Sequence, residues 1–256
     1  MKGSIVLSGV EVIFPHSNFD LSFRHLEIEP GRVTVITGPS GSGKSTLGHA
    51  ATGLLPYMGA AIKGTFQLGA ITIPLADRKA WRGVRGRAVR WIPQEPARVF
   101  TSTLPLLPQM LEGIENPKAH ADTLARLLDV TGLPDQDTLK VRYPFELSGG
   151  MLQRAAVISA FLPTPALVVA DEPTAHLDQP KCLLLARIVT ALARHAKMAV
   201  LWITHDLRLA AAIAHRVIFL SNGRIEMDGS PLDLLDPYGE KPLPLVKASA
   251  RLALPV

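Results

Sequence analysis

The stretch "RVTVITGPSGSGKST", residues 32–46, decides the fold predicted for this chain. A short β-branched run ends in a glycine-rich segment, and "STLGHAATGLL" after it is typical of a helix. The order strand, glycine loop, helix is the context in which the pattern G-x-x-x-x-G-K-[ST] binds phosphate. Glycines let successive backbone N–H groups surround phosphate oxygens, and the positive end of the helix adds to the attraction.

We therefore predict a phosphate loop at nine consecutive residues, Gly38, Pro39, Ser40, Gly41, Ser42, Gly43, Lys44, Ser45 and Thr46. Lys44 is expected to reach the β- and γ-phosphates of a nucleotide, and Ser45 is expected to hold Mg²⁺. An ordinary glycine-rich turn is the alternative interpretation of the same residues.

Strands and helices alternate through the C-terminal half of the chain. The pattern predicts helices over 149–162, 179–196 and 206–214, strands over 166–171, 198–205 and 216–220, and a tight turn at Asn222-Gly223 that leads into 224–229. Such alternation with apolar strands predicts a parallel sheet that is covered on both faces. Residues 95–143 differ, because they contain several prolines, helical patterning in "AHADTLARLLDV" and no convincing strand. They are interpreted as a helical insertion.

Composition bounds the class of protein. A chain of 256 residues is long enough for one large domain, or for a domain with a subdomain. No run approaches the roughly 18 to 20 apolar residues needed to cross a bilayer, and the N-terminus lacks the pattern of an export signal, so a cytosolic protein is expected. The single cysteine, Cys182, excludes an intrachain disulfide, and the eight histidines form no metal-binding pattern.

The formal net charge is +5, but the cations are unevenly distributed. The stretch "DRKAWRGVRGRAVR", residues 77–90, holds six of them, namely Arg78, Lys79, Arg82, Arg85, Arg87 and Arg90. Such a cluster either binds nucleic acid or anionic headgroups, or is a solvated surface. The sequence leaves these alternatives open.

Further candidate site residues follow predicted strands. Asp171 ends "ALVVAD" and can hold magnesium, whereas Glu172 is the candidate that orients or deprotonates an attacking water. His205 follows "AVLWIT" and is expected at the same sheet edge as Lys44. Gln94, in "WIPQEP", carries a neutral amide that can make and break a contact with magnesium or its water.

A second glycine pair lies in "PFELSGGMLQR", residues 144–154, and one nucleotide does not need two glycine-rich loops. Taken in order, "GPSGSGKST", "PQEP", "LSGGMLQR", "ALVVADEPT" and "THD" resemble the ATP-binding subunit of an ABC transporter. The resemblance covers about residues 5–235. The sequence "YPFELSGGMLQRAAVISA" is similar to the corresponding segment in the subfamily that serves importers of peptides, nickel and opine-type metallophores.

The resemblance implies an α/β fold, a P-loop NTPase core of the ABC ATPase type. It implies a mixed, mainly parallel sheet, an N-terminal antiparallel β subdomain and a helical signature subdomain. The nucleotide-binding core would comprise residues 1–94 and 165–235, the helical subdomain about 95–164, and a short tail 236–256. The helical insertion would grip the membrane subunits.

The resemblance also implies roles for matching residues. Gln94 would contact the nucleotide and magnesium and report to the membrane subunits, and Asp171 would join Ser45 and Gln94 at the metal. Glu172 would be the catalytic base and His205 the switch histidine. The signature, which meets the ATP of a partner, would be Ser148, Gly149, Gly150 and Met151. Asp178 would lie in a loop between subunits.

Three positions remain open. Phe14 is the matching position for an aromatic residue that stacks on adenine, with Phe19 as the alternative and a core phenylalanine as a third interpretation. Met151 replaces a common glutamine, and we interpret it as a subfamily variant. His176 departs from the usual wording of the loop before Asp178 and puts communication between the two nucleotide sites in doubt.

The resulting expectation is an ATPase that requires ATP and Mg²⁺ and lies at the cytosolic face of the cell membrane. Its partners would be two multi-span permease subunits, a second ATP-binding subunit that is non-identical or a copy of itself, and indirectly a substrate-binding protein. The alternatives are a soluble ABC ATPase acting on nucleic acid or ribosomes, and an assembly subunit that switches without turnover. Nucleic acid is the less expected partner, because long coiled coils and a second cassette are missing from the sequence.

Overall fold

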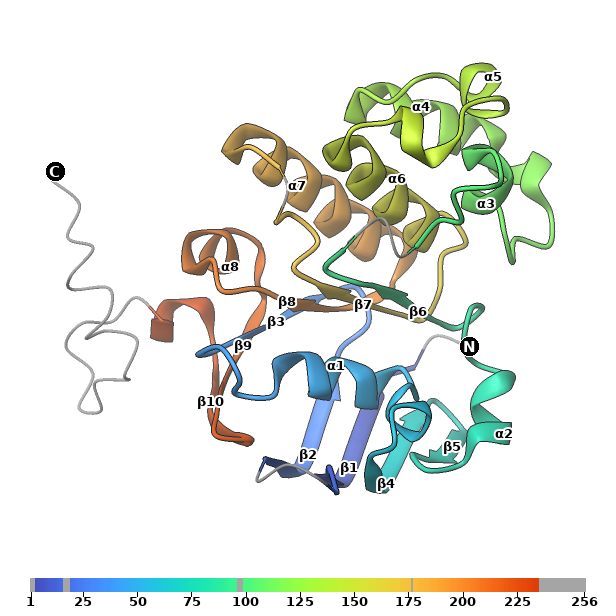
Figure 1. The fold of residues 1–256 in the computed structure, drawn as a ribbon. Coiled ribbons are helices and arrows are strands. Elements are labelled where there is room, and N and C mark those ends of the chain that lie inside the picture. The colour runs from blue at the N-terminus through green and yellow to red at the C-terminus, as the bar shows by residue number, and fades with distance from the viewer. Residues whose placement is uncertain (1–2, 16–18, 96–98, 176, 235–256) are drawn as a thin grey trace, which may run out of the picture.

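The computed structural model describes residues 3–15, 19–95, 99–175 and 177–234 of the chain. Two sheets lie one above the other, with helices between and above them (Figure 1). The predicted tail 236–256 and His176 lie outside the described residues.

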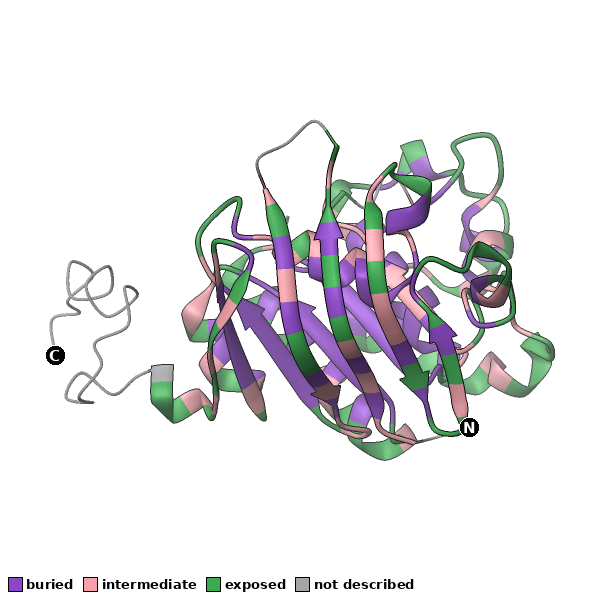
Figure 2. Ribbon diagram, turned by 90° about the horizontal axis from the view of Figure 1, so that it is seen from below, coloured by how far each residue is buried: buried purple, intermediate pink, exposed green. Residues whose placement is uncertain are grey.

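The first sheet is antiparallel, as the sequence resemblance implied. Its order is β2-β1-β4-β5, with β1 Ile5–Ile13, β2 Asp20–Ile28, β4 Ala61–Leu68 and β5 Ile71–Pro74. Figure 2 shows buried and exposed residues alternating along these strands, which is the pattern of a sheet with one covered face. In β1 the buried side chains change from Ile5 and Leu7 to Val10 and Val12, because a bulge at Gly9 adds one residue to the strand.

The second sheet is mainly parallel and has the order β10-β9-β3-β8-β7-β6. Its strands are β3 Val33–Thr37, β6 Val89–Ile92, β7 Leu167–Asp171, β8 Ala199–Ile203, β9 Arg216–Ser221 and β10 Arg224–Gly229. Only β10 is antiparallel to its neighbour, which it reaches through the predicted turn. Asn222 and Gly223 both have positive φ, at 46° and 70°, as a tight hairpin turn requires.

Helices cover both faces of the parallel sheet, as predicted. Helix α1, Lys44–Ala51, lies on the face toward the first sheet, whereas α6, Gly149–Phe161, and α7, Gln179–Ala196, lie on the opposite face (Figure 1). Successive side chains of β3 point to opposite faces, so Val35 packs in the core under α6 and α7, and Ile36 packs in the core around α1.

Between β6 and β7 the described residues form helices and no strand. They include α3 Leu106–Met110, α4 Ala121–Thr131 and α5 Gln136–Leu139, with short 3₁₀ turns at Pro117–His120 and Pro144–Glu146. Helix α8, Leu207–Ile213, packs against α7, and a last 3₁₀ turn covers Pro231–Leu234. Among the described residues, no helix combines the length and apolar character that crossing a membrane requires.

Two local predictions need correction. The helix expected over residues 45–55 ends at Ala51, and Leu55–Tyr57 form a 3₁₀ turn. Gly53 turns the chain with φ of 65°, and a Cβ at this position would lie 2.1 Å from the Trp81 ring. The arginine-rich stretch, for which no helix was predicted, contains the five-residue helix α2, Arg78–Arg82, whose first turn is capped by Asp77.

Candidate nucleotide site

The loop from Gly38 to Gly43 connects β3 to α1 in a conformation that depends on glycine. Gly38, Gly41 and Gly43 have φ of 146°, 77° and 103°, a region that residues with a side chain rarely adopt. A Cβ at Gly38 would lie 2.0 Å from the Leu220 carbonyl oxygen, and one at Gly43 would lie 2.6 Å from the Phe19 ring. The backbone conformation therefore favours glycine at all three positions, and close neighbours also require it at Gly38 and Gly43.

Lys44 and Ser45 begin α1 directly after this loop. The Lys44 Nζ donates hydrogen bonds to the carbonyls of Gly38 and Pro39, at 2.9 and 2.7 Å. Burial lowers the pKa of this ammonium, although the charges of Glu172 and Asp171 oppose the shift. The lysine thus folds back over its own loop, and a positive charge faces the space where the pattern predicts phosphate.

The sheet register brings the predicted acids to the same edge as the loop. Strand β8 pairs in parallel with both β3 and β7, so that Ile203 lies beside Ile36 and beside Asp171. The chain then leaves β3 at Gly38, β7 at Glu172 and β8 at Thr204. Ligands of open parallel sheets bind at this carboxyl edge.

Asp171 is buried, and its side chain is hydrogen-bonded to the side chain of Ser45. Burial raises the pKa of the Asp171 carboxyl, with a further contribution from Glu172, whereas Ser45 and Lys44 lower it. A hydroxyl and a carboxylate held together in this way form an oxygen-rich pair of the kind that Mg²⁺ prefers. The residues present therefore fit a nucleotide with its magnesium ion, as the loop pattern requires.

Glu172 and His205 are in direct contact. The Glu172 Oε1 lies 2.6 Å from His205 Nδ1 and accepts the backbone N–H of His205 at 2.9 Å. Its other oxygen accepts from the Thr204 hydroxyl at 3.2 Å. Sequence reasoning placed Glu172 and His205 at one edge, but it did not identify Thr204, whose hydroxyl carries no distinguishing pattern.

The environment of this pair is asymmetric. The Glu172 side chain is only 11% exposed, whereas the His205 side chain is 77% exposed. The backbone of Glu172 has φ of 46°, a strained value for a residue with a side chain. A buried carboxylate fixed by three donors beside an accessible imidazole is an arrangement suited to orienting a water molecule.

Gln94 lies two residues beyond β6 and is exposed. Strand β6 runs parallel to β7, with Ile92 beside Ala170, so Gln94 leaves the sheet at the same edge as Asp171 and Glu172. Residues 96–98, which follow it, lie outside the described residues.

The two candidate aromatics take different positions. Phe19, just before β2, places its ring against Gly43 of the phosphate loop. Phe14 follows β1 and is half-buried against the core around α1. Both residues thus flank the core that supports the loop, and the assignment of the stacking aromatic stays a prediction.

The second glycine pair begins helix α6. Ser148 caps this helix, because its hydroxyl accepts the Met151 N–H at 3.3 Å. Gly149 is exposed, and a Cβ there would meet no atom within 4 Å. No contact in the described chain therefore requires glycine at this position, unlike Gly38 and Gly43.

Helix α6 lies on the opposite face of the sheet from α1, so the structure does not bring Ser148, Gly149, Gly150 and Met151 into contact with the phosphate loop.

Asp178 caps α7. Its carboxylate accepts the Lys181 N–H at 3.0 Å and pairs with the Lys181 Nζ at 2.5 Å. Both hydrogen bonds lower the pKa of Asp178, and the one from the Lys181 side chain contributes most. The exposed side chain therefore has a structural function in helix capping beside the intersubunit role that the sequence suggested.

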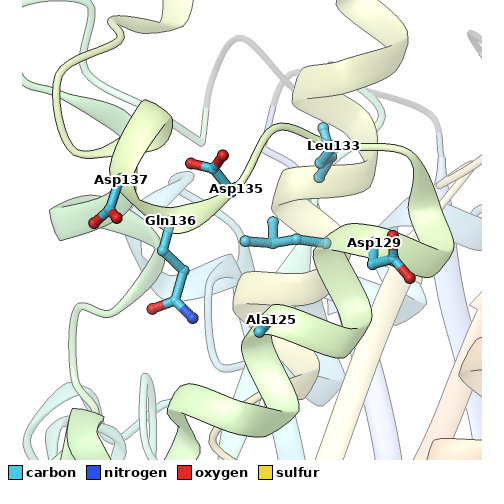
Figure 3. A pocket seen from close by; sticks show the side chains of 7 residues that line it. Ala125, Asp129, Leu133, Asp135, Gln136 and Asp137 are labelled. Carbon is cyan, nitrogen blue, oxygen red and sulfur yellow. The ribbon is translucent and has the colours of Figure 1, made fainter.

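A cavity of about 400 Å³ lies elsewhere, between α4 and α5. Figure 3 shows Asp135, Gln136 and Asp137 on one side of it and Asp129 on the other. Asp135 caps α5, Asp137 pairs with Lys140 at 2.7 Å, and Gln136 donates to the Ala121 carbonyl. Local structure accounts for these polar groups, and we assign the cavity no ligand.

A strand, a phosphate loop and a helix within a mainly parallel sheet define a P-loop NTPase. The model of the family described as ABC transporter matches residues 21–175, and the chain belongs to this family.

Curated relatives support the same assignment. The chain is 30% identical to the nickel import ATP-binding protein NikD of Brucella abortus biovar 1. The alignment spans 236 residues and covers 90% of this chain and 86% of the relative. It is 32% identical to the dipeptide transport ATP-binding protein DppD of Haemophilus influenzae, over 81% of this chain and 64% of the relative. It is 33% identical to the glutathione import ATP-binding protein GsiA of Pectobacterium atrosepticum, over 77% of this chain but only 33% of that longer relative.

Solved structures agree on the fold. The dimeric structure of MJ0796, a bacterial ABC transporter cassette, superposes with a TM-score of 0.75 at 23% identity over 89% of this chain and 98% of that one. The same cassette in a post-hydrolysis state bound to ADP and Pi gives 0.74 at 22% identity, with the same coverage.

Proposed function

We propose that this chain hydrolyses ATP as the energy-coupling subunit of an importer. It would act at the cytosolic face of the cell membrane, beneath two multi-span permease subunits. The observation that carries the proposal is the Glu172 carboxylate, which His205 and Thr204 hold at the sheet edge where the phosphate loop also ends. Hydrolysis needs a group that orients water beside a bound γ-phosphate, and the position of Glu172 at this edge supports that role.

The residues divide the work at the nucleotide. The backbone N–H groups of residues 38–46 and the Lys44 ammonium bind the phosphates, and Ser45, Asp171 and Gln94 hold Mg²⁺. Mg²⁺ held by these residues would neutralise charge on the phosphate oxygens. Glu172 positions the attacking water and takes up its proton, while His205 keeps the carboxylate oriented. Phe14 or Phe19 stacks on the adenine.

Pairing of two ATP-binding subunits explains the second glycine pair. Gly149 is exposed at a helix N-terminus, where the positive end of the dipole favours an anion. Its own chain gives no reason for a glycine there, which supports close approach by a group from outside. Ser148, Gly149, Gly150 and Met151 would close over the γ-phosphate of the partner, so that each ATP lies between two subunits. Asp178 would contribute to the same interface.

The chain would then have two working parts. Residues 1–94 and 165–235 form the nucleotide-binding core, and residues 95–164 form the helical part that contacts the permease. Gln94 lies at the junction and carries the change at the nucleotide to the helical part. The described residues 99–164 contain helices and no strand, which supports this division.

The cargo we propose is a peptide, a nickel ion or a metal chelate such as a metallophore, delivered by a substrate-binding protein. The names of the relatives, which specify nickel, dipeptide and glutathione, support this range. The second ATP-binding subunit would be a related chain or a copy of this one. The relatives give no support to the alternative function on nucleic acid or ribosomes.

Reconstitution tests the proposal. The chain and its permease subunits in proteoliposomes should hydrolyse ATP faster when the cargo-loaded binding protein is added, and should accumulate labelled cargo. Uptake of labelled nickel, peptide and metallophore by a deletion strain then identifies the cargo. ATP hydrolysis that never responds to permease or binding protein would contradict the proposal.

A further inference from the structure

The arginine-rich stretch forms a surface that the nucleotide site does not use. We call it the basic face and define it by Arg78, Lys79, Arg82, Arg85 and Arg87, with Tyr57 and Met58 beside them. Four of the five cations are exposed and Arg85 is half-buried. Arg90 does not belong to this face, because it is half-buried and its Nη2 donates to the Glu112 carbonyl at 3.0 Å.

Helix α2 holds the basic face in a fixed orientation. Trp81, on the inner side of this helix, is fully buried, lies 4.8 Å from the Phe66 ring and donates its Nε1 to the Leu75 carbonyl at 3.3 Å. Gly53 leaves room for the Trp81 ring, as described above. This contact anchors the helix, whose Lys79 and Arg82 side chains are exposed.

Tyr57 organises two of the cations. The guanidinium carbons of Arg78 and Arg85 lie 4.7 and 4.5 Å from the centre of its ring, within cation–π distance. Arg85 also donates to the Tyr57 hydroxyl at 2.8 Å, and Arg78 donates to the Pro56 carbonyl. Tyr57 is still 46% exposed and Met58 51% exposed, so apolar surface lies among the charges.

The charge of the basic face is not neutralised within the described residues. None of its five cations forms an ion pair with a described side chain, and the nearby Asp77 carboxylate accepts the N–H groups of Lys79 and Ala80 at 2.9 and 3.1 Å. Like charges held close together repel one another, so that an anion from outside relieves the repulsion. The face is therefore suited to an anionic partner.

We propose that the basic face binds the anionic headgroups of membrane lipids beside the permease. The inference rests on the proposed function, which places the chain at the membrane. Clustered lysines and arginines attract anionic lipid, and tyrosine is enriched at membrane–water interfaces. Single-stranded nucleic acid fits less well, since it usually needs several exposed aromatic residues for base stacking and this face has one.

The position of the face supports the proposal. A groove of about 390 Å³ is lined by Arg85 and Arg87 of the basic face and also by Val99, Phe100, Gln109 and Glu112. These last four residues belong to the helical part that we assign to the permease. The basic face thus continues the surface that would face the membrane, and lipid bound there would help to keep the ATPase under its permease.

Vesicle binding by the isolated full-length chain tests the inference without the permease. We expect sedimentation with phosphatidylglycerol-containing vesicles, weakening as salt is raised, and little with phosphatidylcholine alone. Reversing two charges, Lys79→Glu with Arg82→Glu, should weaken binding at least about tenfold. The matched control is Arg187→Glu with Arg194→Glu, which makes the same charge change on exposed residues of α7 and should bind like the unaltered chain.

Two results would overturn the inference. One is equal binding of the two charge-reversed variants, which would show that net charge and not this face is responsible. The other is binding of RNA without binding of vesicles. ATP binding by each variant shows that it is folded. Failure here leaves permease-stimulated ATP hydrolysis as an independent test of the proposed function.

Discussion

The Glu172 carboxylate and the His205 imidazole form one unit, with 2.6 Å between Oε1 and Nδ1. The two residues are 33 positions apart in the sequence and meet because β7 and β8 are neighbouring parallel strands. The positive φ of Glu172 turns its carboxylate toward the end of β8. Backbone strain of this kind persists where the surrounding structure fixes it, commonly at functional sites.

Replacing Glu172 with Gln should stop hydrolysis and spare binding. The amide keeps one oxygen to accept the His205 N–H, and its NH2 group can donate to the Thr204 hydroxyl oxygen, but the amide cannot take up a proton. We expect ATP turnover to fall by roughly 100- to 10,000-fold, with ATP affinity and thermal stability close to those of the unaltered chain. Turnover near the original rate would remove Glu172 from the role of base.

Replacing His205 with Ala should reduce turnover less than Glu172→Gln. The Glu172 carboxylate loses the imidazole but retains the Thr204 hydroxyl and the backbone N–H of residue 205. The expected loss is about tenfold to 100-fold, measured as steady-state phosphate release, with ATP affinity retained. The matched control is His195→Ala, an exposed histidine near the end of α7, which should leave the rate unchanged.

Asp171→Asn should stabilise the nucleotide-free chain. Burial raises the pKa of this carboxyl in the fold. The folded protein therefore holds the proton more tightly than the unfolded chain, and this stabilisation is lost as the pH rises through the folded-state pKa. At pH 7 to 8 an ionised Asp171 is unfavourable, and Asn removes that cost.

We expect the melting temperature of Asp171→Asn to exceed that of the unaltered chain at pH 8, by roughly 2–4 °C for each kcal/mol relieved. The difference should shrink toward pH 4, near the ordinary pKa of aspartate. With ATP and Mg²⁺ present the order should reverse, because the variant lacks a carboxylate that we propose holds the metal. A variant less stable than the original at pH 8 without nucleotide would contradict the account.

The choice between Phe14 and Phe19 can be made with two ligands. Because Phe19 packs on Gly43, Phe19→Ala should disturb the loop and weaken ATP and inorganic triphosphate alike. Phe14→Ala should weaken ATP alone, by about tenfold if the ring stacks on adenine. Titration calorimetry with both ligands measures this. Selective loss of ATP affinity in Phe19→Ala would assign the stacking role to Phe19.

Much of the fold could be predicted from the sequence because its signals were local. The helix 179–196 has the predicted bounds, and the Asn222-Gly223 turn forms as expected. The predicted end of α1 was wrong because the observed end depends on a contact distant in sequence, the Trp81 ring against Gly53. Helix α2 was missed because it is only five residues long and buries only one side chain fully, that of Trp81.

The site was predictable as a set of residues but not as a set of contacts. The glycine loop and the acids at the end of β7 can be recognised from their spacing in the sequence. The hydrogen bonds from Thr204 and His205 to Glu172 depend on strand register and on the unusual φ of Glu172, which no single stretch of sequence encodes. Gly149 shows the reverse case, because the structure of one chain gives no reason for it.

ATP-driven pairing tests the central claim most directly. The chain carrying Glu172→Gln, mixed with its partner subunit where that is a different chain, is compared by analytical ultracentrifugation with and without ATP. The same comparison is made after adding Gly149→Asp. We predict ATP-dependent dimers with the first change, and monomers that still bind ATP after the second, since an added carboxylate would repel the phosphate of the partner. Dimers that persist in Gly149→Asp, or equal loss of ATP binding and pairing, would contradict the claim that this glycine pair serves the nucleotide of another subunit.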